Sequence, residues 1–128
     1  MEDRWPVSVK GVLGWGNRFV VLRNHRGEWE LPGGRLEATD HGPVETVRRE
    51  LCEEIGLDVA VGSLVDSWVY KVEGKSVLIL TYRCEADEPE ELQHSDEHTE
   101  VALMDLAGLA DLLIPAGYLR SIREVAAG

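Results

Sequence analysis

Apolar and polar residues alternate over the first part of the chain. Val7, Val9 and Val12 stand among polar or small residues, and a β-branched run follows at residues 18–24. Because successive side chains of a strand point to opposite faces, this period of two predicts two strands. The segment between them, residues 14–17, is rich in glycine and ends on asparagine, which favours a tight turn and therefore a hairpin.

The next stretch has the pattern of a strand end followed by a break. Trp29 to Leu31 continues the strand-like pattern, and Pro32 interrupts it. Gly33 and Gly34 come next, and glycine lets the backbone take conformations that are closed to other residues. We therefore expect the backbone to approach another group closely at these two glycines.

From Pro43 the apolar spacing changes from that of a strand to that of a helix. Gly42 can act as the N-cap, proline suits the first helical position, and Gly56 stands where the C-terminal cap is expected. These signals predict one helix, with its apolar residues facing the core. The apolar positions are Val44, Val47, Leu51 and Ile55.

The rest of the chain predicts β-structure followed by two short helices. Residues 57–72 and 75–86 are two long β-rich segments separated by a Glu-Gly-Lys turn, which indicates a hairpin. A polar loop follows, and residues 99–106 predict one more strand. The helical segments, 106–113 and 118–128, are separated by a break at Pro115.

Composition and charge indicate one folded domain, residues 1–128, with a restricted choice of partners. Hydrophobic residues make up 44% of the chain, and 13 Lys and Arg face 24 Asp and Glu, for a net charge of −11. This charge disfavours nucleic acid, because its phosphate backbone is itself a polyanion. A small phosphorylated molecule remains compatible if metal cations stand between the carboxylates and the phosphates.

The cysteines and the N-terminus indicate a cytoplasmic protein. Cys52 and Cys84 are far apart and outside any Cys-x-x-Cys spacing, so neither a disulfide framework nor a zinc site is supported. The N-terminal residues begin with acids and lack an apolar run, which predicts that there is no secretory signal. No segment approaches the roughly 20 apolar residues of a membrane span, so we expect no membrane partner.

Three glutamates of the predicted helix share one stripe. Glu50, Glu53 and Glu54 lie three or four residues apart, and like charges at this spacing destabilise an isolated helix. One interpretation is a solvated acidic face, because glutamate is a good helix former and Arg48 and Arg49 offset part of the repulsion. The other is a site for Mg²⁺ or Mn²⁺, which take oxygen ligands from carboxylates and phosphates.

The segment from Gly33 to Leu57 resembles the signature of the Nudix hydrolases. That signature is glycine, five residues, glutamate, seven residues, and then Arg-Glu-apolar-x-Glu-Glu-x-Gly-apolar. This resemblance favours a metal site over an acidic surface. Every position of the second half is matched, by Arg49, Glu50, Leu51, Glu53, Glu54, Gly56 and Leu57.

The first half of the signature departs from the family pattern. Counting from Gly34, the position of the glutamate falls on Asp40, and eight residues then precede Arg49. Either Asp40 replaces the first glutamate and one residue is inserted after it, or that carboxylate is missing and His41 holds its place. We favour Asp40, because the loop before the helix can absorb an insertion.

The resemblance implies an α/β fold, an α/β/α sandwich around a mixed β-sheet. It also implies an enzyme that hydrolyses the pyrophosphate linkage of a nucleoside diphosphate joined to another group, with Mg²⁺ or Mn²⁺ as cofactor. In the family pattern, Glu50, Glu53 and Glu54 are metal-binding positions, and the turn at Gly33 and Gly34 lets a backbone carbonyl reach the metal. The partner implied is a small nucleotide.

Further roles follow from the same resemblance. Arg49 matches the arginine that holds the glutamates in place, and together with Glu50 and Glu53 it belongs to the expected catalytic group. Glu97 is our expectation for a general base outside the signature. Arg35 and Asp40 are expected to contact the substrate. Apart from the resemblance, Trp29, Trp68 and Tyr70 offer aromatic faces on which a base can stack, although Trp68 lies in a strand-like run and core packing is its expected role.

Other interpretations of the sequence stay open. A Nudix-like module that senses a nucleotide without cleaving it is the main alternative, although a pure binding module does not need all three metal carboxylates. An acidic interaction scaffold would require the signature to be a coincidence. His94 and His98 lie four residues apart, as in a second metal site, but exposed loop histidines are the simpler interpretation. The sequence does not specify which nucleotide is bound. A homodimer is expected only because small proteins of such folds often form dimers.

Overall fold

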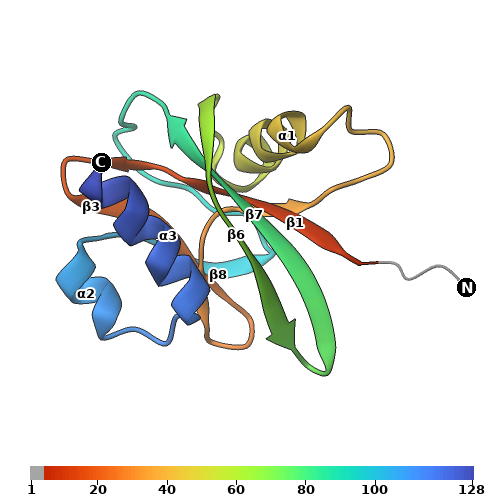
Figure 1. The fold of residues 1–128 in the computed structure, drawn as a ribbon. Helices are drawn as coiled ribbons and strands as arrows, with labels where there is room; N and C mark the ends of the chain where they lie inside the picture. Colours follow the sequence, from red (N-terminus) through yellow and green to blue (C-terminus); the bar gives the residue numbers. More distant parts are fainter. Residues whose placement is uncertain (1–4) are drawn as a thin grey trace, which may run out of the picture.

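A computed structural model describes residues 5–128 and shows strands layered between helices (Figure 1). The elements are β1 (Val7–Val12), β2 (Gly14–Trp15), β3 (Arg18–Asn24), β4 (Trp29–Glu30), β5 (Gly33–Arg35), α1 (Pro43–Ile55), β6 (Ala60–Val72), β7 (Lys75–Glu85), β8 (His98–Met104), α2 (Leu106–Ala110) and α3 (Ala116–Ala127).

The strands form two sheets. The first has the order β5-β1-β7-β6 and is mixed, because β1 and β7 are parallel while the other two pairs are antiparallel. The second is antiparallel and has β3 at its centre, paired with β2, β4 and β8. Between the two sheets, the Val20 N–H of β3 donates to the carbonyl of Leu13, the residue that follows β1, at 2.9 Å.

Helices cover both sides of this strand layer, with α1 on one side and α2 and α3 on the other (Figure 1). Alternation along β3 shows why both sides are apolar. Val20 and Leu22 belong to the core cluster that holds α1, whereas Phe19 and Val21 belong to the cluster that holds α3. The expected α/β/α sandwich around a mixed sheet is therefore confirmed.

Helix α1 has the bounds and caps that its sequence predicts. Gly42 is the N-cap, proline occupies the first turn, and Gly56 ends the helix in the left-handed conformation with φ of 70°. Val47, Leu51 and Ile55 are buried, which leaves the opposite side of the helix to solvent and to a cleft. Val44 is 45% exposed and is the one expected apolar position that does not face the core.

The expected hairpin between residues 7–12 and 18–24 is wrong, because these two strands do not pair with each other. Strand β3 turns back on the short β2 through residues 16–17, whereas β1 leaves this sheet and lies between β5 and β7. Nearly every residue of β1 is buried, as in a central strand covered on both faces. Local alternation predicts a strand but does not determine which strands pair with it. The glycine-rich break after Pro32 also contains a strand, β5, that the sequence did not indicate.

The later elements follow the sequence more closely. The β6–β7 hairpin turns at Glu73 and Gly74, and β8, α2 and α3 lie where a strand and two helices were expected. Within residues 5–128, none of the helices is long and apolar enough to cross a membrane. The first four residues, on which part of the secretory-signal prediction depends, lie outside the described residues.

Replacing Leu51 by alanine tests how α1 is held. We expect the free energy of unfolding to fall by about 2–5 kcal/mol, because Leu51 is completely buried and its truncation leaves a cavity. Val44→Ala on the same helix is the matched control, with an expected loss below about 0.5 kcal/mol because Val44 is exposed. Urea unfolding followed by circular dichroism measures both, and equal losses would show that α1 is anchored differently.

Candidate functional site

A cleft of about 440 Å³ lies where α1, the start of β5, β1 and the end of β3 meet the segment before β8. Pairing of β3 with β8 brings that segment into place, since Asn24 lies opposite His98. Residues from five separate parts of the sequence therefore share one cavity. They are Ser8, Lys10, Asn24, His25, Arg26, Glu30, Gly33, Gly34, Arg35, Glu37, Glu50, Glu54, Glu97 and His98.

Three carboxylates converge in the cleft. Glu50 and Glu54 lie one turn apart on α1, and Glu97 reaches them from the segment before β8. Each offers an oxygen atom, and these oxygens lie within 4.8 Å of one another. It is the only such group of potential metal ligands among residues 5–128. Three carboxylates at this separation suit a hard divalent cation.

Gly33 and Gly34, which begin strand β5 where a turn was expected, bring the backbone directly against the carboxylate of Glu50. A side chain at Gly34 would overlap the carboxyl group of Glu50, and a side chain at Gly33 would overlap the Val9 carbonyl. Gly33 also has φ of 145°, which favours glycine. The expected close approach of the backbone at these two glycines is therefore present, and the group approached is Glu50.

Glu54 is the most unusual group in the cleft. Its side chain is almost fully buried, and neither of its oxygens has a hydrogen-bond partner among the described residues. Burial raises the pKa of Glu54 to about 7, although Lys10 and His98 act in the opposite direction. Burial also raises the pKa of Glu50, against the effect of Arg49. Two buried acids without enough positive charge fit a bound divalent cation.

Behind Glu54 lies a charged group that the sequence did not reveal. Nε2 of His98 is 2.7 Å from Oε1 of Glu30, and its Nδ1 is 3.8 Å from Oε2 of Glu54. Lys10 is 6% exposed and close enough to Glu30 and Glu54 to interact with both electrostatically. Burial would raise the pKa of Glu30, but Lys10 and His98 outweigh it and lower it to about 2.

The expectation that His98 is an exposed loop residue is wrong, because it begins β8 and is buried. His94 is exposed and bonds only the neighbouring Ser95 carbonyl. The one sequence signal for this group is Lys10, a lysine inside a strand that is otherwise apolar or small.

Arg49 links the carboxylates to the loop before α1. Its Nη1 lies 3.0 Å from Glu50 and 3.4 Å from Glu53. Its other nitrogens bind Asp40, with Nε 3.1 Å from Oδ1 and Nη2 3.0 Å from Oδ2. Thr46 and the Glu37 N–H also donate to Asp40, each at 2.9 Å. These donors, with Arg49 foremost, hold the pKa of Asp40 well below its usual range.

The other residues expected at the site lie outside the carboxylate group, either at the edge of the cleft or in the core. The side chain of Glu53 is 59% exposed and lies outside the three-carboxylate group, while Arg35 lines the rim of the cleft. Trp29 is buried in the core that holds α3, so the structure gives its ring a packing role. Trp68 and Tyr70 contact each other, with ring centroids 5.5 Å apart, and pack against that core.

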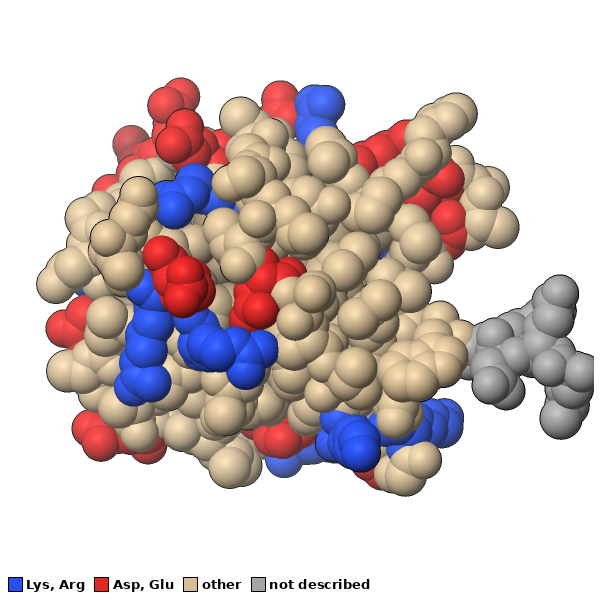
Figure 2. Space-filling model, viewed as in Figure 1, with Lys and Arg blue, Asp and Glu red and all other residues tan. Residues whose placement is uncertain are grey.

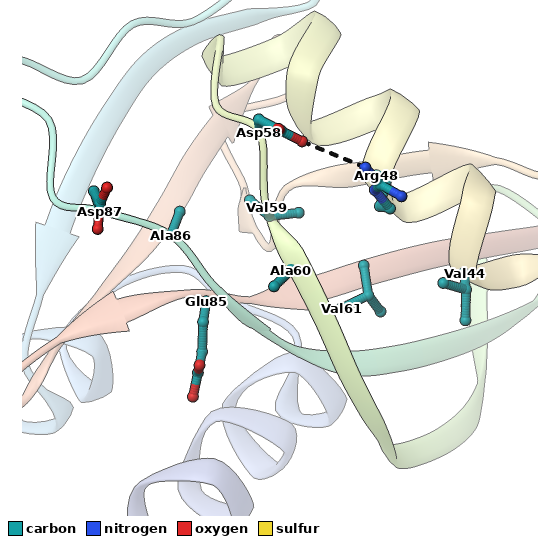
Figure 3. A pocket seen from close by; sticks show the side chains of 9 residues that line it. All are labelled: Val44, Arg48, Asp58, Val59, Ala60, Val61, Glu85, Ala86 and Asp87. Carbon is teal, nitrogen blue, oxygen red and sulfur yellow. Dashed lines mark ion pairs between the residues drawn. The ribbon is translucent and has the colours of Figure 1, made fainter.

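A second hollow lies beside α1, against the start of β6 and the end of β7 (Figure 3). It contains an ion pair between Arg48 and Asp58, 3.6 Å apart, while Glu85 and Asp87 lie away from that pair. Its carboxylates do not converge as those of the cleft do.

Figure 2 shows acidic side chains gathered along the upper edge of one face, over α1 and the loop after β7.

The sequence profile of the NUDIX domain matches residues 7–125, most of the chain. The chain belongs to the NUDIX domain family. The three converging carboxylates, Gly33 and Gly34 therefore lie within the NUDIX domain.

Similar proteins are found among curated sequences and solved structures. A MutT-like protein of Streptomyces ambofaciens is 41% identical over 80 residues, which are 61% of this chain and 50% of that protein. An 8-oxo-dGTP diphosphatase of Proteus vulgaris is 47% identical over 55 residues, 40% of this chain and 48% of that protein. The chain thus spans about half the length of the curated relatives it matches.

The NUDIX fold is also supported by structure. The crystal structure of the MutT protein from Methanosarcina mazei Go1 superposes with a TM-score of 0.82, covering 99% of this chain and 96% of that chain. Sequence identity is 22%, so this likeness concerns the fold.

The buried Glu54 predicts a pH dependence of stability in metal-free solution. Because its folded-state pKa of about 7 lies above the ordinary value of 4.5, the folded protein holds this proton more tightly than the unfolded chain does. The contribution of Glu54 to stability is therefore present below about pH 4.5 and is lost as the pH rises through about 7.

Glu54→Gln removes this ionisation. In buffer with a chelator, we expect the variant to gain on the order of 2 kcal/mol relative to the unmodified protein between pH 5 and about 8. Chemical unfolding at several pH values measures the difference. A difference that does not change with pH would contradict the environment assigned to Glu54.

Proposed function

We propose that this protein is a metal-dependent hydrolase of the pyrophosphate linkage in a nucleoside diphosphate joined to another group. The observation that carries the proposal is the convergence of Glu50, Glu54 and Glu97, with both oxygens of Glu54 unpartnered. Membership of the NUDIX domain family and the diphosphatase named among the relatives support the reaction type.

The cofactor that fits this group of ligands is Mg²⁺ or Mn²⁺. Glu50, Glu54 and Glu97 would hold it, and Gly33 and Gly34 line the same cleft. When bound, such a cation polarises a phosphoryl oxygen and lowers the pKa of water, which are the two contributions that pyrophosphate hydrolysis needs most.

The protein supplies position and a proton acceptor. Arg49 holds Glu50 and Glu53 by its guanidinium, whose planar fork suits carboxylates better than an ammonium would. Glu97 is exposed and offers one oxygen to the ligand group, so its second carboxylate oxygen is the one that would accept a proton from the attacking water. Arg35, on the rim, is placed to neutralise a phosphate of the substrate.

We assign Asp40 a positioning role in place of the substrate contact expected from the sequence. Its side chain is 2% exposed, and both oxygens receive hydrogen bonds from the protein itself. It therefore anchors Arg49, which in turn orients Glu50. We therefore propose that Asp40 takes the place of the first glutamate of the signature, with the extra residue in the loop between Asp40 and α1.

The first test is metal-dependent hydrolysis of nucleotide derivatives by single glutamine variants. We expect Glu50→Gln and Glu54→Gln to lower kcat at least about 100-fold, because each removes a charge from the metal site. Glu124→Gln on α3 is the matched exposed control and should retain activity.

Two outcomes would contradict parts of the proposal. Unchanged turnover in Glu53→Gln would show that Glu53 is not part of the mechanism expected from the signature. Binding of nucleotides without turnover in the unmodified protein would favour the sensing module.

A pair of loop variants tests the role of Asp40. Asp40→Asn should lower kcat about 10–100-fold with little change in KM, because the carboxylate that fixes Arg49 is lost while the cleft itself is intact. His41→Asn, one residue further on, should stay within about twofold, because His41 makes no side-chain contact with Arg49 among the described residues. Steady-state kinetics compare the two, and a larger effect at His41 would reverse the assignment.

A further inference from the structure

Glu97 lies at the end of a long loop, unlike the other two carboxylates of its group. Residues 86–97 join β7 to β8, and most of them are exposed. Such loops are more mobile than the elements that they connect. Glu50 and Glu54 are fixed by α1, so the position of Glu97 relative to them depends on whatever restrains this loop.

The residues on both sides of Glu97 are attached to the hairpin that β3 and β4 form. Nε2 of His25, in the turn of that hairpin, lies 2.8 Å from the carbonyl oxygen of Asp96. On the other side, His98 pairs with Asn24 in the β3–β8 ladder. Glu97 is therefore held between two attachments to one hairpin.

The chemistry of the contact between His25 and Asp96 determines its direction. A carbonyl oxygen only accepts hydrogen bonds, so Nε2 of His25 carries a proton and donates it. The 2.8 Å separation is typical of an N–H···O hydrogen bond. The bond forms with the neutral ring that is protonated on Nε2 and equally with the charged ring, so it does not depend on the ionisation of His25.

The turn that carries His25 is closed by the side chain of Asn24. The Oδ1 atom of Asn24 accepts from the Arg26 N–H at 3.0 Å and from the Glu28 N–H at 3.1 Å. The Asn24 N–H donates to the Glu28 carbonyl at 2.8 Å, and Gly27 has φ of 86°, which favours glycine. An asparagine that closes a turn in this way restrains the residues inside it. His25 is thus presented to the loop from a well-braced turn.

The duties proposed for Glu97 require such restraint. One of its oxygens belongs to the three-carboxylate group, and the other would accept the proton of the attacking water. Catalytic and metal-binding groups must be held to within roughly 0.5 Å of their working positions. A change in the loop that moves Glu97 by more than this would reduce both metal binding and catalysis.

We propose that His25 is a positioning residue, which holds Glu97 in the three-carboxylate group by donating a hydrogen bond to the Asp96 carbonyl. This inference rests on the proposed function and extends the site from the signature to the turn between β3 and β4. In this role His25 contacts neither the metal nor the substrate.

The first experiment measures steady-state kinetics of His25 variants with saturating Mg²⁺. We expect His25→Ala to lower kcat about tenfold and to change KM less than about twofold. His25→Gln places an amide N–H near the position of Nε2 and should stay within about threefold of the unmodified protein. A raised KM with unchanged kcat would make His25 a substrate contact and would overturn the inference.

His94→Ala is the matched control in the same loop. The His94 ring is exposed and bonds only the neighbouring Ser95 carbonyl, so its removal should change kcat less than about twofold. A loss equal to that of His25→Ala would show that any disturbance of the loop has the same effect, and would contradict a specific role of His25.

A double-mutant cycle tests whether His25 acts through Glu97. If it does, adding His25→Ala to Glu97→Gln should lower kcat less than about twofold further, because the carboxylate that His25 positions is already absent. Losses that multiply in the double variant would show that His25 acts independently of Glu97.

Two measurements without substrate separate this inference from the proposed reaction. Titration with Mn²⁺, with the free ion measured by electron paramagnetic resonance, should show about tenfold weaker binding to His25→Ala and little change for His25→Gln. In metal-free protein, the amides of residues 95–98 should exchange hydrogen faster in His25→Ala than in the other two proteins. If these shifts occur and no nucleotide is hydrolysed, the proposed function alone fails. Normal Mn²⁺ affinity and unchanged exchange in His25→Ala would overturn the inference.

Discussion

The incompletely balanced negative charge of Glu50 and Glu54 is the constraint on which this site depends. Both carboxylates are buried at one end of the cleft, and Glu97 adds a third close by. Burying charged groups is costly when too few partners offset it, and here burial raises the pKa of both acids even though Arg49 lies 3.0 Å from Glu50. Lys10 and His98 reduce this cost but do not give the oxygens of Glu54 a hydrogen bond. The divalent cation that we propose for this site would supply the missing positive charge.

The surrounding structure holds these acids together against their repulsion. Helix α1 is fixed to the strand layer by Val47, Leu51 and Ile55, so its acidic stripe cannot rotate away from the cleft. Gly33 and Gly34 close one side, and Asp40 restrains Arg49 on another. Each of these contacts is small by itself. Together they fix the distances between the carboxylates, on which binding of the proposed metal would depend.

Local signals in the sequence predict local structure well. Helix α1 has its expected bounds because Gly42, Pro43 and Gly56 act within a few residues of its ends. The partners of β1 were not predicted, because strand pairing is decided by tertiary contacts between distant segments. The second sheet was missed for the same reason, since β3 and β8 are separated by most of the chain.

At the site, too, some residues could be predicted from the sequence and others could not. The carboxylates of α1 were visible as a helical stripe, and the family signature gave that stripe a chemical meaning. Glu30, His98 and Lys10 form no pattern in the sequence, because only the folding of β1, β4 and β8 brings them together. The packing of Trp29, Trp68 and Tyr70 against the core could not be predicted either, because exposed and buried rings look alike in a sequence.

The most direct test of the central claim is to locate a bound ion. A crystal of the protein grown with Mn²⁺ and measured at a wavelength where manganese scatters anomalously would show where the ion lies. The account predicts an anomalous peak coordinated by oxygens of Glu50, Glu54 and Glu97. A peak only at another acidic surface, such as the hollow beside Asp58, or a cleft without manganese at saturating concentration, would contradict it.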